Sequence, residues 1–526
     1  MSGLPPTLRL STLVSALCVI GQLHATDTMR FNYDGYVQYN SITGNSPSSS
    51  MLTSGWVHHN LFSLYLKGVY EGFDYNINAG VKLTNDRRKD IKGISLLNLA
   101  GVIKNENHTL DLGDFFKSYS KYSLSTSLKG ASYTYTTKDK DTFNLSYGLA
   151  YPRWDNFWDD EADSTEREVL GVRYNKNLTE ALSVGFDLVK TEDSNSKVAN
   201  IPLYETTLYT LNTTYKPIAG LKIYSEYSFS ENETDNGTST INKNGSAFFL
   251  QAIGNKNPSR VQLEYERISP NFKTVTGSAT ADREKIKSTW RYKITNLTTM
   301  NSGFLWFRDN LENSKTNTTH TYRPNFGFTF KQLFERRYAV VDVNSKLNII
   351  ESGNTKTYDK MFDINYRDRF DIVYSDMNFA YNIYDTNNNG RKQNEFRFNS
   401  TLSTRHTYND FVIKPSWIFG TWDMSDELTN NQDSKYYQNA LGLGFDIPRY
   451  KITTNLKVGY NTSTRESGDD LDKMFGSFDA YWKLGKIESF KDVMLYTKAS
   501  INDFSYTTSS NDYQEKSITL GVKMTF

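Results

Sequence analysis

The chain ends with Ile518-Thr519-Leu520-Gly521-Val522-Lys523-Met524-Thr525-Phe526, and this stretch decides the fold. Side chains of a β-strand alternate between two faces, so the apolar ones in this stretch share one face. That face carries Ile518, Leu520, Val522, Met524 and Phe526. Chain termini of soluble domains are usually polar and frayed. The alternation is instead typical of a strand with lipid on one side and water on the other.

The same alternation recurs along the whole chain. Clear instances are Phe73–Leu83, Phe143–Tyr151, Leu182–Leu188 and Leu221–Phe229. Strict alternation over this length predicts half-buried strands, and no stretch has the period of an amphipathic helix. The mean hydropathy is low, at -0.61, although the chain has 36 Tyr and 31 Phe. Many short amphipathic strands account for both values.

Counting these segments predicts about 26 strands, within a range of 22 to 26. The expected connections alternate between short and long. Short ones are expected at 71–72, 105–106, 138–141, 216–220 and 367–368. Long ones are expected at 41–54, 152–166, 192–200, 231–243, 269–280, 310–318 and 426–434. Short turns at one end and long loops at the other are expected of a transmembrane barrel.

On these residues the chain resembles bacterial outer-membrane β-barrel proteins as a class, with no single family indicated. The resemblance implies an all-β fold, a single large antiparallel up-and-down barrel, located in the bacterial outer membrane and surrounded by its lipid. It also implies that the closing strand is the signal for the barrel-assembly machinery. The residues that carry this signal are Leu520, Val522, Met524 and Phe526. A soluble all-β array is the alternative fold, because it shares the alternation.

The first 25 residues differ from the rest. Arg9 is followed by an apolar run and then by Ala25, a pattern that indicates a secretory signal peptide with cleavage after Ala25. The predicted division is therefore a signal peptide at 1–25 and a barrel at 26–526. Cys18 is the only cysteine, so a cleaved chain has no thiol chemistry.

The polar faces of two successive strands carry opposite charges. One bears Gln262, Glu264 and Glu266. The next bears Lys285, Lys287, Thr289, Arg291 and Lys293, while Trp290 lies on its lipid face. If the two strands are neighbours, a basic ladder stands beside an acidic one inside the barrel. Such rows select solutes in channels, and they equally form plain cross-strand ion pairs, so both interpretations stay open.

A second inward set contains Glu395 and Arg397, opposite the lipid-facing Phe396 and Phe398. It supports a polar lumen without indicating a solute. Farther upstream, the alternation breaks at Gly113. Glycine at such a point marks either a bulge or a place where the chain turns into the bore.

No catalytic or metal-binding constellation is recognisable, so we expect neither an enzyme nor a cofactor. His58 and His59 are adjacent and point to opposite faces of a strand. Trp154, Phe157 and Trp158 lie in an acidic loop, where they suit a membrane-interface girdle better than a glycan contact. Lys and Arg number 60 and Asp and Glu 59, so no bulk charge indicates nucleic acid.

Two functions are compatible with these features. The first is a porin-like channel for passive passage of small hydrophilic solutes. The second is a sheath that holds a partner protein in the lumen, such as a multihaem cytochrome that carries electrons across the membrane. No plug segment precedes the first expected strand, and barrels of about 22 strands already need one. Either loops fold inward, or a partner fills the bore, or the strand count is too high.

Overall fold

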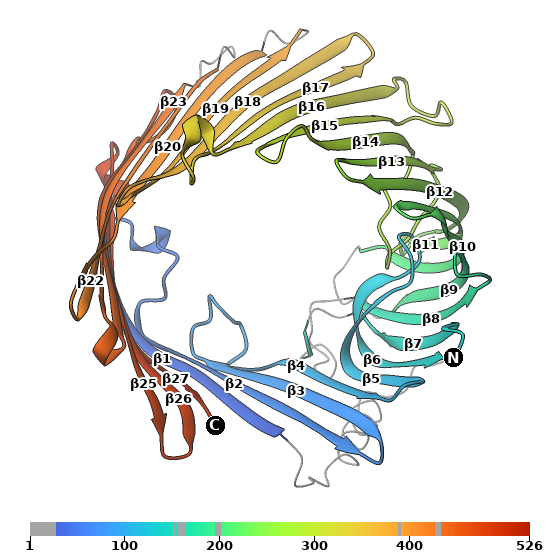
Figure 1. Cartoon of the computed structure of the whole chain (residues 1–526), viewed down its shortest axis with the longest axis horizontal. Helices are drawn as coiled ribbons and strands as arrows, with labels where there is room; N and C mark the ends of the chain where they lie inside the picture. Colours follow the sequence, from blue (N-terminus) through green and yellow to red (C-terminus); the bar gives the residue numbers. More distant parts are fainter. Residues whose placement is uncertain (1–27, 151–152, 155–164, 195–200, 388–390, 427–432) are drawn as a thin grey trace.

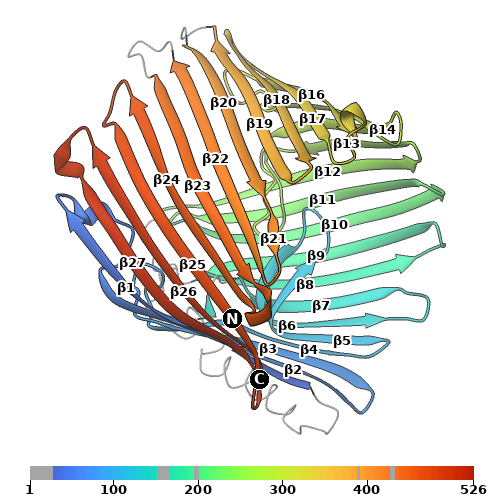
Figure 2. The same ribbon diagram turned by 60° about the vertical axis from the view of Figure 1, so that its left-hand side comes forward.

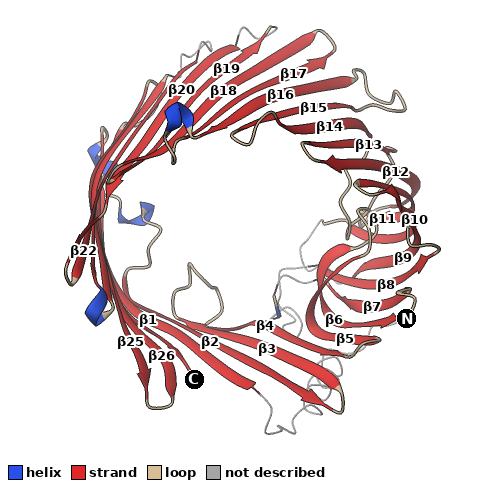
Figure 3. Ribbon diagram, viewed as in Figure 1, coloured by secondary structure: helices blue, strands red, loops and turns tan. Residues whose placement is uncertain are grey.

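The chain folds into one closed barrel in the computed structural model (Figures 1 and 3). The structure describes residues 28–150, 153–154, 165–194, 201–387, 391–426 and 433–526. Each described strand pairs antiparallel with the strands before and after it in the chain, except that β20 and β21 both pair with β22 and not with each other. The last strand pairs back onto the first, from Asn32 opposite Thr525 to Gly44 opposite Tyr513, and this pairing closes the barrel.

The strands of the first half are β1 Thr28–Gly44, β2 Gly55–Tyr70, β3 Phe73–Thr84, β4 Ile94–Lys104, β5 His108–Ser118, β6 Ser125–Thr136, β7 Thr142–Leu149, β8 Glu166–Asn177, β9 Leu182–Ser194, β10 Leu203–Ile218, β11 Leu221–Asp235, β12 Thr240–Lys256 and β13 Ser259–Ile268. Those of the second half are β14 Arg283–Lys293, β15 Thr298–Arg308, β16 Thr319–Lys331, β17 Val340–Ser352, β18 Thr355–Phe370, β19 Val373–Thr386, β20 Arg391–Thr404, β21 His406–Tyr408, β22 Phe411–Asp426, β23 Ser434–Ile447, β24 Ile452–Arg465, β25 Leu471–Ile487, β26 Phe490–Tyr506 and β27 Tyr513–Thr525. Short 3-10 turns lie at η1 Pro47–Ser49, η3 Leu333–Glu335, η4 Pro448–Tyr450 and η5 Ser509–Asn511.

The barrel wall contains 26 strands. Of the 27 described strands, β20 and the three-residue β21 follow each other along the same neighbour, β22, and so form one member of the wall. The predicted fold class and the prediction of about 26 strands are therefore confirmed. Figure 2 shows the long strands β22 to β27 side by side.

Cross-strand register assigns every second residue to the lumen. Around the closing seam, Tyr496, Gly521, Tyr36 and His59 lie directly opposite one another on β26, β27, β1 and β2. Their sequence neighbours point outward, and Leu520 is 63% exposed on that outer face. Large apolar side chains are exposed in this way on strand after strand. The alternation seen in the sequence is thus a division between a lipid-facing exterior and a polar interior.

Thr28 and Phe526 lie at one rim, which we call the terminal rim and predict to be periplasmic; the opposite one is the distal rim. Most connections at the terminal rim are short, as predicted, but the segment between β16 and β17 is not. Two predicted connections are wrong. The turn expected at 367–368 lies at 371–372, because the alternating strand β18 runs on to Phe370. The long loop expected at 231–243 is reduced to 236–239, since β11 and β12 stay paired up to Asp235.

The closing strand is held by its terminal aromatic. Phe526 N donates a hydrogen bond to Phe31 O at 2.8 Å. Its ring lies 5.4 Å from the ring of Phe31 and 4.2 Å from that of Phe490, between centroids. Lys523 and Asp34 form an ion pair of 2.6 Å across the seam. The predicted signal peptide lies outside the described residues.

Candidate functional site

The β5–β6 hairpin leaves the barrel wall and enters the lumen. β4 pairs with β5 only up to Gly113, and β6 pairs with β7 only from Lys129 onward. Beyond these points the two strands pair only with each other, as far as Ser118 opposite Ser125. Gly113 has φ +77°, and a Cβ at this position would overlap the carbonyl of Leu99. Gly113 therefore marks a turn into the bore, the second of the two interpretations that the sequence left open.

The hairpin tip, residues 119–124, docks on a buried carboxylate of the inner wall. Glu226 of β11 is 1% exposed. It accepts hydrogen bonds from Ser120 Oγ at 2.8 Å, Lys121 N at 3.1 Å and Tyr122 N at 2.9 Å. Tyr224 Oη donates a fourth at 2.7 Å. One carboxylate thus satisfies two backbone amides that would otherwise be buried without partners.

Two further carboxylates hold the same tip. Lys121 pairs with Glu266 of β13, and Tyr122 Oη donates to the same carboxylate at 2.9 Å. Ser123 Oγ donates to Asp187 of β9 at 2.9 Å. Burial lowers the pKa of the Lys121 ammonium, although the hydrogen bond that it donates to Glu266 acts in the opposite direction. Burial also raises the pKa of the Tyr119 hydroxyl to about 12. The tip is therefore anchored on three strands that lie far from it in sequence.

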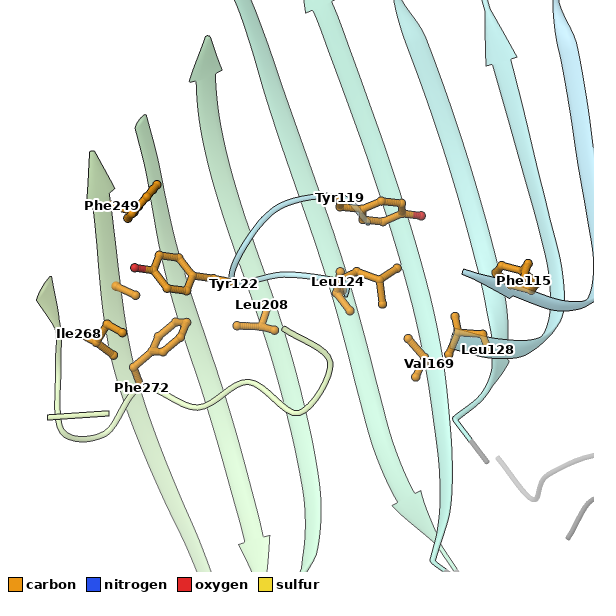
Figure 4. Close-up of a cluster of buried hydrophobic side chains, with 12 residues drawn as sticks. Phe115, Tyr119, Tyr122, Leu124, Leu128, Val169, Leu208, Phe249, Ile268 and Phe272 are labelled. Atoms are coloured by element: carbon orange, nitrogen blue, oxygen red, sulfur yellow. The ribbon is translucent and has the colours of Figure 1, made fainter. Parts of the chain in front are cut away.

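A second inward segment, residues 269–282, covers the tip. Thr276 O accepts from Ser125 N at 2.7 Å, and Ser278 N donates to Lys121 O at 2.8 Å. Phe272 packs edge-on against Tyr122, with ring centroids 5.7 Å apart. These residues join an apolar cluster on the inner wall (Figure 4). The cluster contains Phe115, Tyr119, Tyr122, Leu124, Leu128, Val169, Val189, Leu208, Ala247, Phe249, Ile268 and Phe272.

Trp154 packs behind the displaced hairpin. It is fully buried, in a cluster with Leu149, and Leu96 and Leu99 pack against them. Its Nε1 donates to Asp114 Oδ2 at 2.6 Å. At Trp154 both expectations, an interface girdle and a glycan contact, are wrong, because the departing hairpin leaves an apolar space that this ring fills. Phe157 and Trp158 lie outside the described residues.

Residues 85–93, between β3 and β4, are fixed by a buried carboxylate. Asp90 pairs with Lys82 and Arg153, the latter at 2.9 Å, and accepts from Ser95 Oγ at 2.9 Å. Lys92 N donates a further bond at 3.0 Å. Burial alone would raise the pKa of the Asp90 carboxyl, but these donors together hold it well below its usual value of 3.8.

The inner wall is consequently covered on one side and bare on the other. On β8 to β13 the inward side chains nearer the distal rim are buried, as at Val169, Leu208 and Ile268. On β16, β17 and β24 the inward Asn325, Lys346 and Asn455 are exposed to the lumen. Figure 1 shows the same asymmetry, with β5 and β6 bending inward on the right. The sequence left three possibilities for the wide bore: inward loops, a partner protein or too high a strand count. Inward segments do cover this part of the wall, and the strand count was not too high.

The predicted charge ladders lie on neighbouring strands, at the border of the covered wall. Glu264 is directly opposite Lys287, and Glu266 is directly opposite Lys285. Lys285 pairs with Glu266, which Lys121 also contacts, and Lys287 lies 3.8 Å from Glu264. In this distal half the two rows form cross-strand ion pairs, and Glu266 also holds the hairpin tip through Lys121.

The terminal half of the same ladder has a different arrangement. Arg291 lies directly opposite Arg260, with like charges facing each other. Arg260, Arg291 and Lys293 are exposed, and among the described residues none of them forms an ion pair. Sequence analysis did not single out Arg260, although its even number places it on the face of Gln262 and Glu264.

The second inward set lies on β20, on the bare wall. Arg397 pairs with Glu395 two residues away. Glu395 also accepts from Trp422 Nε1 at 2.6 Å and from Asn382 Nδ2 at 3.2 Å. The charges of this set are therefore largely satisfied within the wall. Its role in solute passage stays a prediction.

Sequence reasoning missed the residues that shape the lumen most. Glu226, Asp187 and Asp90 are single carboxylates on alternating strands or in a loop, and nothing in their spacing marks them. Their partners are 104 to 106 residues away for Glu226 and 64 for Asp187. Only the break at Gly113 signalled an unusual path.

In the part of the chain that the structure describes, no three His, Cys, Asp or Glu side chains gather closely enough to hold a metal ion. Within the same residues, no helix has the length and hydropathy required to cross a membrane.

The barrel has a closed wall, an apolar exterior, a polar interior and a terminal aromatic at the seam. This chain has the fold of a large transmembrane β-barrel. The sequence model of the family described as S-layer protein SlpA, beta-barrel domain, matches residues 103–311. None of the curated proteins compared with the chain matches it.

Several solved structures resemble the barrel at low sequence identity. The outer membrane transporter YddB from Escherichia coli is 10% identical with a TM-score of 0.46, over 96% of this chain and 81% of that one. Pseudomonas aeruginosa OccK3 (OpdO) is 13% identical with a TM-score of 0.36, over 68% and 96%. The P pilus usher (PapC) translocation pore is 10% identical with a TM-score of 0.39, over 94% and 99%.

Proposed function

We propose that the barrel is a water-filled channel through which small hydrophilic solutes pass the outer membrane passively. One observation carries the proposal: between β14 and β24 charged and amide side chains of the inner wall are exposed to the lumen. Lys346 of β17 and Asn455 of β24 are examples, both exposed. A polar wall of this kind supports a continuous water path.

The size of the bore supports passage of more than ions. With strands about 4.8 Å apart and tilted by about 40°, a round 26-strand barrel has a backbone diameter of about 50 Å. The inward hairpin and residues 269–282 narrow this space from the side of β8 to β13. The channel is therefore eccentric, and its open part lies along the bare wall.

Conductance of the purified protein in planar bilayers tests the proposal. We expect stepwise conductance, together with swelling of proteoliposomes in isosmotic sugars. Heat-denatured protein from the same preparation is the control. Protein that inserts as a folded barrel, judged by its protease resistance and heat-modifiable mobility, but conducts nothing would refute the channel.

The bare wall also keeps the second hypothesis open to test, because it leaves room for a protein partner. In the sheath, a partner such as a multihaem cytochrome would contact β14 to β27. Mild solubilisation from native membranes, with absorbance in the haem Soret band, distinguishes the two. A haem-free single species that conducts supports the channel and opposes the sheath.

The remaining predicted contacts belong to the same proposal. The assembly machinery would read the closing strand with Leu520, Val522, Met524 and Phe526, and lipid would contact the outer face. Leu520 is 63% exposed and Phe526 is 37% exposed on that face, so both are accessible to such partners.

A further inference from the structure

The terminal half of the basic ladder differs from the distal half in its lack of counter-charges. A single row of directly opposed residues crosses six strands at this level: Asn255, Arg260, Arg291, Asn301, Gly327 and Asn344. These six residues include two guanidinium groups and three amides but no carboxylate. The next residue of the row, Asp363 of β18, accepts hydrogen bonds from Asn344, Asn365 and Asn378. Like charges directly opposite on neighbouring strands destabilise a sheet. A compensating anion bound between the two guanidinium groups would relieve this repulsion.

The neighbouring rows do not supply that anion. Toward the distal rim, the next row runs through Gln262, Thr289 and Gly303 and has no carboxylate on these strands. Toward the terminal rim, Lys293 adds a third cation. The first carboxylate on its row is Asp342 of β17, which already pairs with Arg367 at 2.9 Å.

In the distal half, the same two strands place opposite charges directly across from each other. There, Glu264 and Glu266 of β13 stand opposite Lys287 and Lys285 of β14. Two residue pairs farther along, β13 carries Arg260 in place of an acid. The exposed positions of Arg260 and Arg291 face the lumen water rather than a covering loop.

We propose that Arg260, Arg291 and Lys293 form a binding site for small oxyanions, carboxylates or phosphates, at the terminal end of the lumen. Planar guanidinium groups bind such anions through paired N–H donors, which an ammonium group does less specifically. The inference rests on the proposed channel for its solute supply and names the solute class for that channel. Asn255 and Asn301 flank the two guanidinium groups and place amide donors beside the bound anion.

Direct binding tests the site without relying on conduction. Inorganic phosphate and succinate are titrated separately into the detergent-solubilised barrel by calorimetry at low ionic strength. In the double variant R260Q/R291Q we expect the dissociation constant to rise at least tenfold. The matched control is K457Q/K498Q, which removes the same charge from inward positions on β24 and β26. We expect the control to bind like the wild type.

Thermal unfolding gives a second readout that separates a site from a folding defect. A ligand that binds only the folded state raises the Tm by mass action. Phosphate or succinate should raise the Tm of the wild type and of the control, but not that of R260Q/R291Q. Without anion, R260Q/R291Q should melt at or above the wild-type temperature, because a repulsive pair is removed.

Each result of these measurements either supports the anion site or overturns it. No binding to the wild type, equal binding to R260Q/R291Q, or an equal loss in the control would overturn the site. Tighter binding of phosphate or of succinate, when lost in R260Q/R291Q, supports it and identifies the preferred group. Anion binding by a barrel that conducts nothing in bilayers leaves the site standing and refutes the channel.

Discussion

Replacing Glu226 by Gln is the sharpest test of the docked hairpin. Three hydrogen bonds from the tip end on this carboxylate, from Ser120 Oγ, Lys121 N and Tyr122 N. A hydrogen bond to a charged group contributes about 1.5 to 3 kcal/mol. The amide keeps one acceptor oxygen, so one bond is lost and the others weaken. We expect docking to weaken by about 3 kcal/mol, which is about 100-fold in the docking equilibrium.

Spin-label mobility measures the docking. Ser118 is exposed near the hairpin tip and accepts a label as Ser118→Cys, and the predicted signal cleavage removes the chain's own Cys18. We expect a largely immobile spectrum with Glu226 and a mobile component with E226Q. The matched control is E264Q, the same change at a carboxylate that hydrogen-bonds Gln251 and Gln262 but not the tip.

Two results would contradict the reasoning. An unchanged spectrum in E226Q would mean that Glu266, Asp187 and the apolar cluster hold the tip without this carboxylate. An equal change in E264Q would mean that the label responds to lumen charge rather than to docking. In the expected case, the single-channel conductance of E226Q also changes, because the tip no longer narrows the bore in a fixed place.

Three further changes have defined outcomes. G113A forces a side chain into φ +77° and against Leu99 O, so we expect about 1 to 3 kcal/mol of destabilisation and a mobile label at Ser118→Cys; an unchanged label spectrum would show that the hairpin turns without this glycine. F526A removes the ring contacts with Phe31 and Phe490, so we expect less folded barrel in membrane fractions by heat-modifiable gel mobility, whereas F526Y should fold normally. The folded-state pKa of Asp90 lies well below 3.8, so its contribution to stability is present above pH 3.8 and is lost as the pH falls below that value; a spin label at Ile91→Cys should stay immobile at and above pH 3.8, and a label already mobile there would contradict the assignment.

The alternation in the sequence was sufficient to predict the barrel wall, because the face that each side chain takes depends only on local strand geometry. A strand has two faces, so Leu520 and Lys523 are assigned to lipid and lumen by parity alone. Counting alternating segments then gave the number of strands. The ends of strands were less certain, as at 231–243, because pairing beyond the membrane continues through polar residues such as Glu231 and Lys243 that also suit a loop.

The sequence by itself therefore determined a closed barrel, its two faces and its closing strand. Only the tertiary structure decided the shape of the lumen and which charges are free in it. The hairpin tip meets Glu226 and Glu266, 104 to 145 residues away, and such contacts leave no periodic trace in the sequence. Cross-strand register, which closure fixes, paired Lys285 with Glu266 and set Arg260 against Arg291. Ladders that look uniform in the sequence are thus neutral at one end and cationic at the other.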